Sequence, residues 1–157
     1  NKLSKIDYYF SKYKNLEFIF DRPKMINLKG IISRNRKNYS FRENKWPLFP
    51  PQSCISVKRK TIQKNIGKLF KKKFPLTTLD FRIAALSDQF RDNAFFLDNE
   101  LTYYFQHDDN ESNKNFSLFN SNWLKRRLEG FNYYENVNKK KIRNVDYYIT
   151  KIINIFF

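Results

Sequence analysis

The chain has 157 residues, of which 31 are Lys or Arg and 15 are Asp or Glu, so its formal net charge is +16. The single cysteine, Cys54, excludes an intramolecular disulfide and a cysteine-based zinc site, and the single histidine, His107, argues against a His-ligated metal centre. No run of 18 apolar residues is present, which excludes a membrane-spanning helix. The length fits one domain over residues 1–157.

The N-terminal third combines helix and strand patterns. Residues 3–16 place apolar side chains three or four positions apart, which predicts a helix. Asp21-Arg22-Pro23 is then expected to end whatever structure precedes it. Residues 25–32 alternate loosely and finish with β-favouring side chains, so they are predicted to form a strand.

Residues 34–51 have no hydrophobic period and contain three prolines. Their basic residues are interspersed with the aromatic residues Tyr39, Phe41 and Trp46. We interpret this stretch as an extended basic and aromatic segment of the domain that folds against RNA, with a flexible linker as the alternative.

Residues 53–58 alternate with period two, which predicts a half-buried strand. Residues 61–74 predict a helix with two unlike sides. One side carries the apolar stripe Ile62, Ile66, Leu69, Phe70 and Phe74, which is expected to pack on the core, and another carries Lys60, Lys64, Lys68, Lys71 and Lys72. This lysine column suits phosphate or an anionic lipid head-group, and a solvated face is the alternative.

Pro75 is expected to end that helix, and the next begins near Thr77–Asp80. Its apolar stripe, Leu79, Ile83, Leu86 and Phe90, predicts the best-buried helix of the protein. Residues 94–106 fit either a hairpin around Asp98-Asn99 or an exposed aromatic segment. Residues 107–115 are polar and predict a surface loop.

The C-terminal part predicts two helices. Ser121 is expected to cap a short one that Gly130 closes, with Trp123 as a core anchor in preference to a base-stacking platform. Residues 145–156 predict a final amphipathic helix. Together these elements predict an α+β fold, a mostly helical small domain with a few short strands and extended basic segments.

The charges are unevenly distributed along the chain. Residues 1–79 carry a net charge of +16, residues 80–111 carry −6, and residues 112–157 carry +6. The acidic segment 80–111 is either a contact for a neighbouring basic protein or a solvated loop.

No catalytic group is predicted. The three glycines are scattered, so no phosphate-binding loop exists, and His107-Asp108-Asp109 lacks a second histidine. Cys54, in an apparent strand, is expected to be a buried inert thiol. We therefore expect a protein that is not an enzyme, with no cofactor, no metal and no small-molecule substrate.

A large positive charge interleaved with aromatic residues favours nucleic acid as the partner, because Lys and Arg bind phosphates and aromatic rings stack on unpaired bases. The residues predicted to contact RNA are Arg34, Arg36, Lys37, Tyr39, Phe41, Arg42, Lys45, Trp46, Lys58, Arg59, Lys60, Lys64, Lys68, Lys71, Lys72, Lys73, Lys125, Arg126, Arg127, Lys139, Lys140, Lys141 and Arg143.

Phe, Ile, Asn, Lys and Tyr make up about half the chain, which is the bias of an AT-rich genome. With the charge and the basic stretch 34–45, this composition resembles the small ribosomal proteins encoded in AT-rich mitochondrial genomes, particularly those of ciliates. The resemblance implies a structural constituent of an organellar ribosome in the mitochondrial matrix, with ribosomal RNA and neighbouring ribosomal proteins as partners.

Two alternatives remain open. One is a peripheral, non-catalytic subunit of a mitochondrial respiratory-chain membrane complex, with the basic helix on an anionic membrane face and an apolar patch near the last helix. The other is a soluble DNA- or RNA-processing factor, which needs a concave cluster of ionisable groups. The ribosomal interpretation instead predicts phosphate contacts dispersed over several segments.

Overall fold

The computed structural model describes residues 1–27, 29–30, 32–34, 39–41, 46–107 and 121–156. The helices and strands in chain order are α1 (Lys2–Lys12), β1 (Phe18–Ile26), β2 (Ile32–Arg34), β3 (Ile55–Val57), α2 (Arg59–Leu69), α3 (Leu79–Ser87), β4 (Ala94–Phe105), α5 (Ser121–Asn138) and α6 (Val145–Phe156). Short 3-10 turns cover Gln52–Cys54 and Asp88–Asn93. The predicted α+β class, mostly helical, is confirmed.

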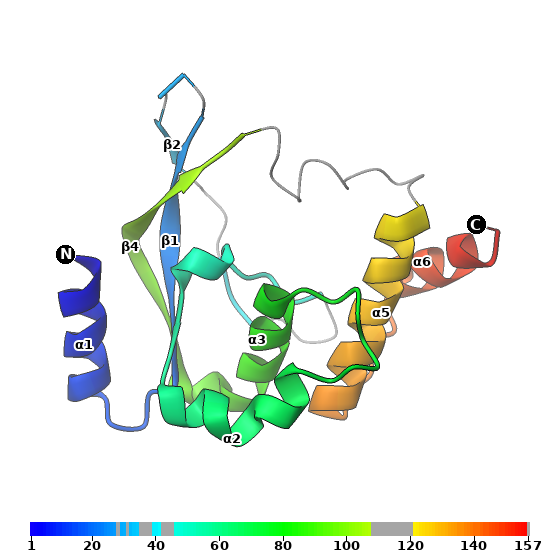
Figure 1. Cartoon of the computed structure of the whole chain (residues 1–157), viewed down its shortest axis with the longest axis horizontal. Helices are drawn as coiled ribbons and strands as arrows, with labels where there is room; N and C mark the ends of the chain where they lie inside the picture. The colour runs from blue at the N-terminus through cyan, green and yellow to red at the C-terminus, as the bar shows by residue number, and fades with distance from the viewer. Residues whose placement is uncertain (28, 31, 35–38, 42–45, 108–120, 157) are drawn as a thin grey trace.

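The sheet is organised around β1 (Figure 1). β2 and β3 pair with it antiparallel, and β4 pairs with it in parallel. The prediction that Asp21-Arg22-Pro23 ends the preceding structure is wrong, since β1 runs through all three residues. Pro23 is tolerated because the β1–β4 register shifts on either side of Arg22, and such irregularities accommodate a residue without an N–H donor.

Two other predictions about strands differ from the strand bounds in the structure. The stretch 25–32 is not one strand, because β1 ends at Ile26 and β2 begins at Ile32. Between them Gly30 has a φ of +72°, a left-handed conformation that glycine adopts without steric cost. Residues 94–105 form the single strand β4, so the hairpin alternative for this stretch is wrong.

β1 separates two apolar clusters. Phe18 and Phe20 face the main core, whereas Ile19 contacts Leu97 and Ile6 of α1 on the other side. This alternation is the ordinary period of a strand buried on both faces.

The buried carboxylate Asp21 anchors α1 to the sheet. The side chain is only 1% exposed. Thr102 Oγ1 donates to Asp21 Oδ1 at 2.7 Å, and Lys2 Nζ lies 2.7 Å from Oδ2. The charge of Asp21 is therefore compensated inside the fold.

α3 lies at the centre of the helical part, and its prediction as the best-buried helix is confirmed. Every residue from Phe81 to Ser87 is buried, whereas Leu79 and Phe90 of the predicted stripe are half-buried. The helix is thus covered all round instead of along one stripe.

α5 is longer than the sequence predicts. Gly130 does not close it, and the helix continues to Asn138, beyond which Lys139 takes a positive φ of 57°. A Cβ atom on Gly130 would lie 2.6 Å from the Trp46 indole. Gly130 is therefore a close-packing position instead of a helix end.

Candidate nucleic-acid interface

α2 is rotated relative to the orientation that its apolar residues predict. Leu69 is buried, but Ile66 and Phe70 are 56% and 59% exposed, so the prediction that both pack on the core is wrong. Thr61 and Asn65 are buried in their place. The helix also ends at Leu69, earlier than predicted.

Hydrogen bonds explain this rotation. Thr61 Oγ1 donates to the carboxylate of Glu17, at the start of the sheet. Asn65 Nδ2 donates to the Thr61 carbonyl at 2.9 Å, and Lys58 N donates to the Glu17 carbonyl at 3.1 Å. Polar side chains with partners can be buried, and here they take the inner face that Ile66 would otherwise occupy.

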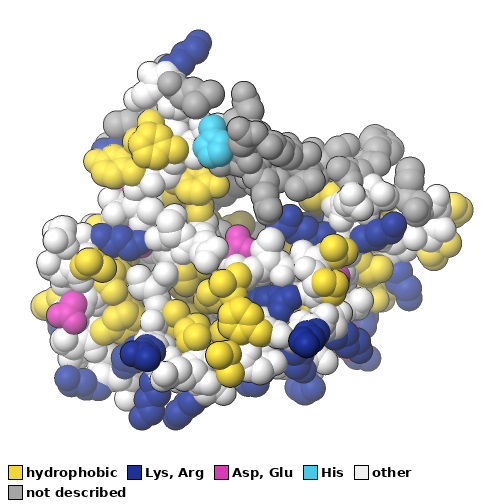
Figure 2. All heavy atoms as spheres, viewed as in Figure 1, with side chains coloured by type: hydrophobic (Ala, Val, Ile, Leu, Met, Phe, Trp, Pro, Cys, Tyr) yellow, Lys and Arg dark blue, Asp and Glu magenta, His cyan; other side chains and the backbone are white. Residues whose placement is uncertain are grey.

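The outer face of α2 therefore mixes cations with apolar side chains. Arg59, Lys60 and Lys64 are exposed, and no carboxylate of the described residues pairs with them. Ile66 is exposed on the same helix, and so is Phe70, which directly follows its last residue. Figure 2 shows Lys and Arg side chains along the lower edge of the molecule, where α2 lies, with hydrophobic side chains between them. Exposed cations along one helix, with an exposed ring at its end, suit phosphates and stacked bases together.

A buried arginine shapes the loop that follows α2. Arg82 is 8% exposed and donates to the carbonyls of Leu69 (2.5 Å), Thr77 (2.9 Å) and Phe74. Its guanidinium lies 5.4 Å from the centroid of the Tyr133 ring. These acceptors include both ends of the loop, so one guanidinium holds residues 69–77 in a fixed shape.

The loop is also tied to α5. Glu129 Oε1 accepts from Thr77 N at 2.7 Å and from Thr77 Oγ1 at 2.8 Å. Lys71 Nζ donates to Asn136 Oδ1 at 2.6 Å, so its ammonium already has a protein partner. Lys72 and Lys73 are exposed and have no carboxylate partner among the described residues.

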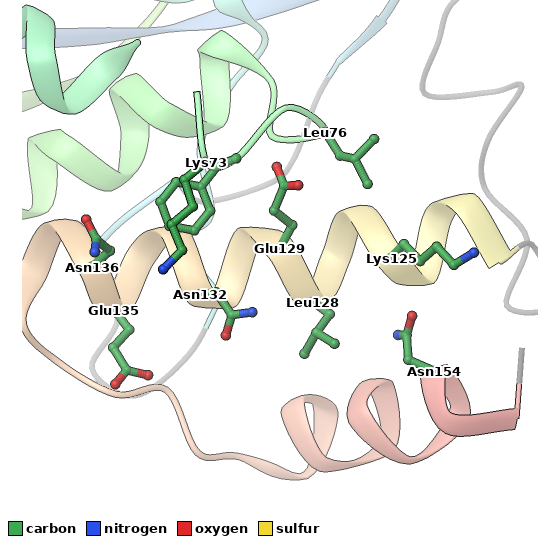
Figure 3. Close-up of a pocket in the computed structure, with 10 residues that line it drawn as sticks. Lys73, Leu76, Lys125, Leu128, Glu129, Asn132, Glu135, Asn136 and Asn154 are labelled. Carbon is green, nitrogen blue, oxygen red and sulfur yellow. The ribbon is translucent and has the colours of Figure 1, made fainter. Parts of the chain in front are cut away.

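A groove of about 650 Å³ separates this loop from α5 and the end of α6 (Figure 3). Lys73, Lys125 and Asn132 line it. Glu129, also in the lining, is directed toward the loop and is engaged by Thr77. The lining also includes Glu135, so the groove offers two ammonium groups and an exposed amide beside two carboxylates that already have protein partners.

The cluster 139–143 is partly neutralised. Glu135 Oε2 lies 2.8 Å from Arg143 Nη2, and Oε1 lies 3.6 Å from Lys141 Nζ. The hydrogen bond from Arg143 lowers the pKa of Glu135 below its ordinary value. Lys139 and Lys140 are exposed.

Three further predicted cations contact the protein. Lys58 Nζ donates to the Lys14 carbonyl at 2.7 Å, and Lys68 Nζ donates to Gln89 Oε1 at 2.9 Å. Arg127 pairs with Asp146. Arg126 is half-buried.

The aromatic residues of segment 34–51 pack mainly inside the protein. The Trp46 indole lies 4.5 Å from the Phe81 ring, 4.8 Å from the Phe131 ring, and 4.5 Å from the Arg127 guanidinium. These contacts give the half-buried Trp46 a packing role, and its contact with RNA stays a prediction.

The ring centroid of Phe41 lies 5.2 Å from that of Phe96 and 6.3 Å from that of Phe20, so this half-buried residue also packs within the protein. Tyr39 is half-buried. Arg34 ends β2. The predicted residues Arg36, Lys37, Arg42 and Lys45 lie outside the described residues.

Trp123, predicted as a core anchor, is half-buried with the Arg127 guanidinium 5.2 Å from its ring. Trp46 is the tryptophan that packs against the main core. The sequence does not predict that Trp46 takes the packing role expected of Trp123, because Trp46 lies in a stretch without hydrophobic period.

The acidic segment 80–111 does not form one outward face. Asp88 is buried, where it accepts from Tyr134 Oη and lies 2.6 Å from Arg91 Nε. Burial is the main cause that raises the pKa of Tyr134 above its ordinary value, and its hydrogen bond to Asp88 raises this pKa further. Asp98 is exposed and pairs with Arg22 at 2.6 Å. Asp108 and Asp109 lie outside the described residues.

Cys54 is fully buried. Burial, and to a smaller extent the negative charge of Asp21, raises the pKa of its thiol to about 11, so a thiolate does not form near neutral pH. Over the described ranges, no three His, Cys, Asp or Glu side chains gather closely enough to hold a metal ion. No helix in the described part of the chain combines the length and apolarity needed to cross a bilayer.

No protein-family model, no curated protein and no solved structure matches this chain.

Proposed function

We propose that the protein binds RNA as a structural, non-catalytic constituent of an organellar ribosome in the mitochondrial matrix. The observation that carries the proposal is the exposed side of α2, where Arg59, Lys60 and Lys64 are exposed and the exposed ring of Phe70 directly follows the last residue of the helix. Lys72 and Lys73 extend the same positive charge into the loop held by Arg82.

RNA suits this surface for two physical reasons. Ammonium groups without carboxylate partners gain free energy from phosphates, because each contact releases counterions condensed on the polymer. The exposed phenyl ring of Phe70, at the end of the same helix, offers a stacking surface to an unpaired base. Backbone contacts of this kind position the protein without selecting a base sequence.

The ribosomal part of the proposal rests on composition and net charge, which resemble those of mitochondrially encoded ribosomal proteins. Partners would be ribosomal RNA and neighbouring ribosomal proteins. Cosedimentation with a particle that ribonuclease dissolves is the expected result on a sucrose gradient of organelle lysate. Migration of the protein that ribonuclease leaves unchanged would contradict it.

The alternative, a peripheral subunit of a respiratory-chain membrane complex, has one observation in its favour. α6 exposes an apolar face that includes Ile152 and Phe156. That face belongs to a different helix from the cations of α2, so contact with RNA and contact with lipid are separately testable.

The interface is tested by replacing Lys60, Lys64 and Lys72 together with Gln. We expect the affinity for a structured RNA with single-stranded loops to fall at least roughly tenfold at low salt. The slope of log affinity against log salt should shrink by about 0.7–0.9 for each lysine that no longer neutralises a phosphate. Fluorescence anisotropy over a salt series measures both quantities.

The matched control replaces Lys5, Lys14 and Lys29, which lie outside α2 and its loop, by Gln. It removes the same charge and should leave most of the affinity. Equal losses in both triple variants would show that net charge alone binds RNA, and the α2 surface would be refuted. Phe70→Ala should weaken binding to single-stranded RNA without changing the salt slope.

A further inference from the structure

The outward face of α6 is apolar along its whole length. Six side chains at helical spacing are between 50% and 80% exposed: Val145, Tyr148, Ile149, Ile152, Ile155 and Phe156. Their spacing of three and four residues puts them on one stripe. A contiguous patch of this kind on a protein surface marks a contact with another apolar body.

The inward face of the same helix is the more polar one. Thr150 is buried, Asn154 Nδ2 donates to the Thr150 carbonyl at 2.8 Å, and Asp146 pairs with Arg127. Tyr147 supplies the main apolar contact with α5, at 5.3 Å from the Phe131 ring. A helix folded only against its own domain would show the opposite arrangement, so the outer face is built for an occupant.

The charges around α6 indicate which occupant fits. Lys151 is exposed on the helix itself, and Lys139 and Lys140 are exposed just before it. A second copy of the chain would bring two formal charges of +16 together, which opposes self-association. An anionic surface is favoured instead.

The position of α6 fits a flat surface. The helix lies at one extremity of the molecule, away from the sheet (Figure 1), and Figure 2 shows hydrophobic side chains at that end with Lys and Arg side chains nearby. A helix at an extremity of the described part of the chain can present its exposed stripe to a flat surface.

We propose that α6 docks in the interface of an anionic phospholipid bilayer. Its apolar stripe enters the boundary of head-groups and acyl chains, while Lys139, Lys140 and Lys151 contact lipid phosphates. The amphipathic ring of Tyr148 suits the level of the head-groups, and Phe156 extends the apolar face that enters the membrane. This inference does not depend on RNA binding, because it uses a different helix.

The test is vesicle flotation of the full-length, ribonuclease-treated protein, with phosphatidylcholine vesicles that contain or lack phosphatidylserine. A chain of net charge +16 binds anionic vesicles through charge alone, so each variant is compared at low and at raised salt. We expect wild-type protein to stay bound at raised salt and Ile152→Glu to lose at least about tenfold in partitioning.

The matched control is Ile66→Glu, which adds the same charge at an isoleucine of α2 with nearly the same exposure, 56% against 55%. It should float like the wild type. Circular dichroism verifies that both variants fold. Equal flotation of Ile152→Glu and wild type at raised salt would refute the proposal, and so would the absence of anionic-vesicle binding.

A concentration-dependent dimer that Ile152→Glu dissociates would also refute it, because a second copy would then occupy the face. Sedimentation velocity without vesicles measures this. Loss of flotation in Ile152→Glu with unchanged RNA affinity separates the lipid proposal from the RNA proposal. The Lys60, Lys64 and Lys72 triple variant should show the opposite result, a loss of RNA affinity with flotation at raised salt retained.

Discussion

Glycine has opposite roles at two helical positions of this chain. Gly67 lies in α2 with no atom within 4 Å of the place a Cβ would take. Gly130 lies in α5, where a Cβ would come within 2.6 Å of the Trp46 indole. The Trp46 ring cannot move away freely, because Phe81 and Phe131 pack against it.

We predict that Gly130→Ala destabilises the protein and that Gly67→Ala stabilises it. At Gly67 alanine should add roughly 0.5–1 kcal/mol through helix propensity. At Gly130 the same gain is outweighed by overpacking, which costs about 1–3 kcal/mol. Chemical denaturation of both variants measures the difference, and stabilisation by Gly130→Ala would show that Trp46 does not pack closely on α5.

At the scale of elements, the loop after α2 depends on a residue of the next helix. Arg82, in α3, donates to carbonyls on both sides of Lys72 and Lys73. The loop is short of apolar anchors, with Phe74 buried and Leu76 exposed. Its shape, and with it the placement of the two lysines, therefore comes from hydrogen bonds to one side chain.

Replacing Arg82 by Met should destabilise the protein by about 3 kcal/mol or more, because several buried carbonyls lose their donor. Trypsin should also cleave after Lys71, Lys72 and Lys73 faster than global unfolding allows. Limited proteolysis with mass spectrometry, beside a denaturation curve, measures both effects.

Arg59→Met, at an exposed position of α2, is the control and should change stability by less than about 0.5 kcal/mol. If Arg82→Met does not fold, Arg82→Lys keeps the charge without the planar fork and should show the same loop cleavage in a folded protein. Trypsin resistance equal to the wild type would exclude Arg82 as the organiser of the loop.

For the whole molecule, self-repulsion is the dominant electrostatic feature. The formal net charge is +16, and no ion pair between described residues involves Arg59, Lys60 or Lys64 of α2. Such a charge opposes the compact state until salt or a polyanion screens it. The fold is thus expected to be most stable when its anionic partner is bound.

We predict that the melting temperature of the isolated protein rises between about 0.02 M and 0.5 M potassium chloride, because the screening length shrinks from roughly 20 Å to a few ångströms. Potassium chloride is chosen instead of a sulfate salt, because sulfate also stabilises folded proteins by being excluded from their surface. The Lys60, Lys64 and Lys72 triple Gln variant should show a weaker rise. A melting temperature that falls with salt would mean that attractive ion pairs outweigh the repulsion.

The amino-acid sequence alone determined the fold class, the burial of α3 and the final helix, because these depend on local hydrophobic period and on breakers nearby. It also determined the net charge, from which a polyanionic partner is inferred. These properties are carried by neighbouring residues, so a single pass along the chain finds them.

The tertiary structure decided which faces remain outside. α2 is oriented with Thr61 inward because Thr61 donates a hydrogen bond to Glu17, which is far away in the sequence, and this orientation leaves Phe70 exposed. Gly130 resembled a helix end in the sequence because its contact with Trp46 joins segments that no local pattern relates. α6 shows its apolar stripe outward because its inner partners come from α5. Exposure depends on distant contacts, which hydrophobic period does not encode.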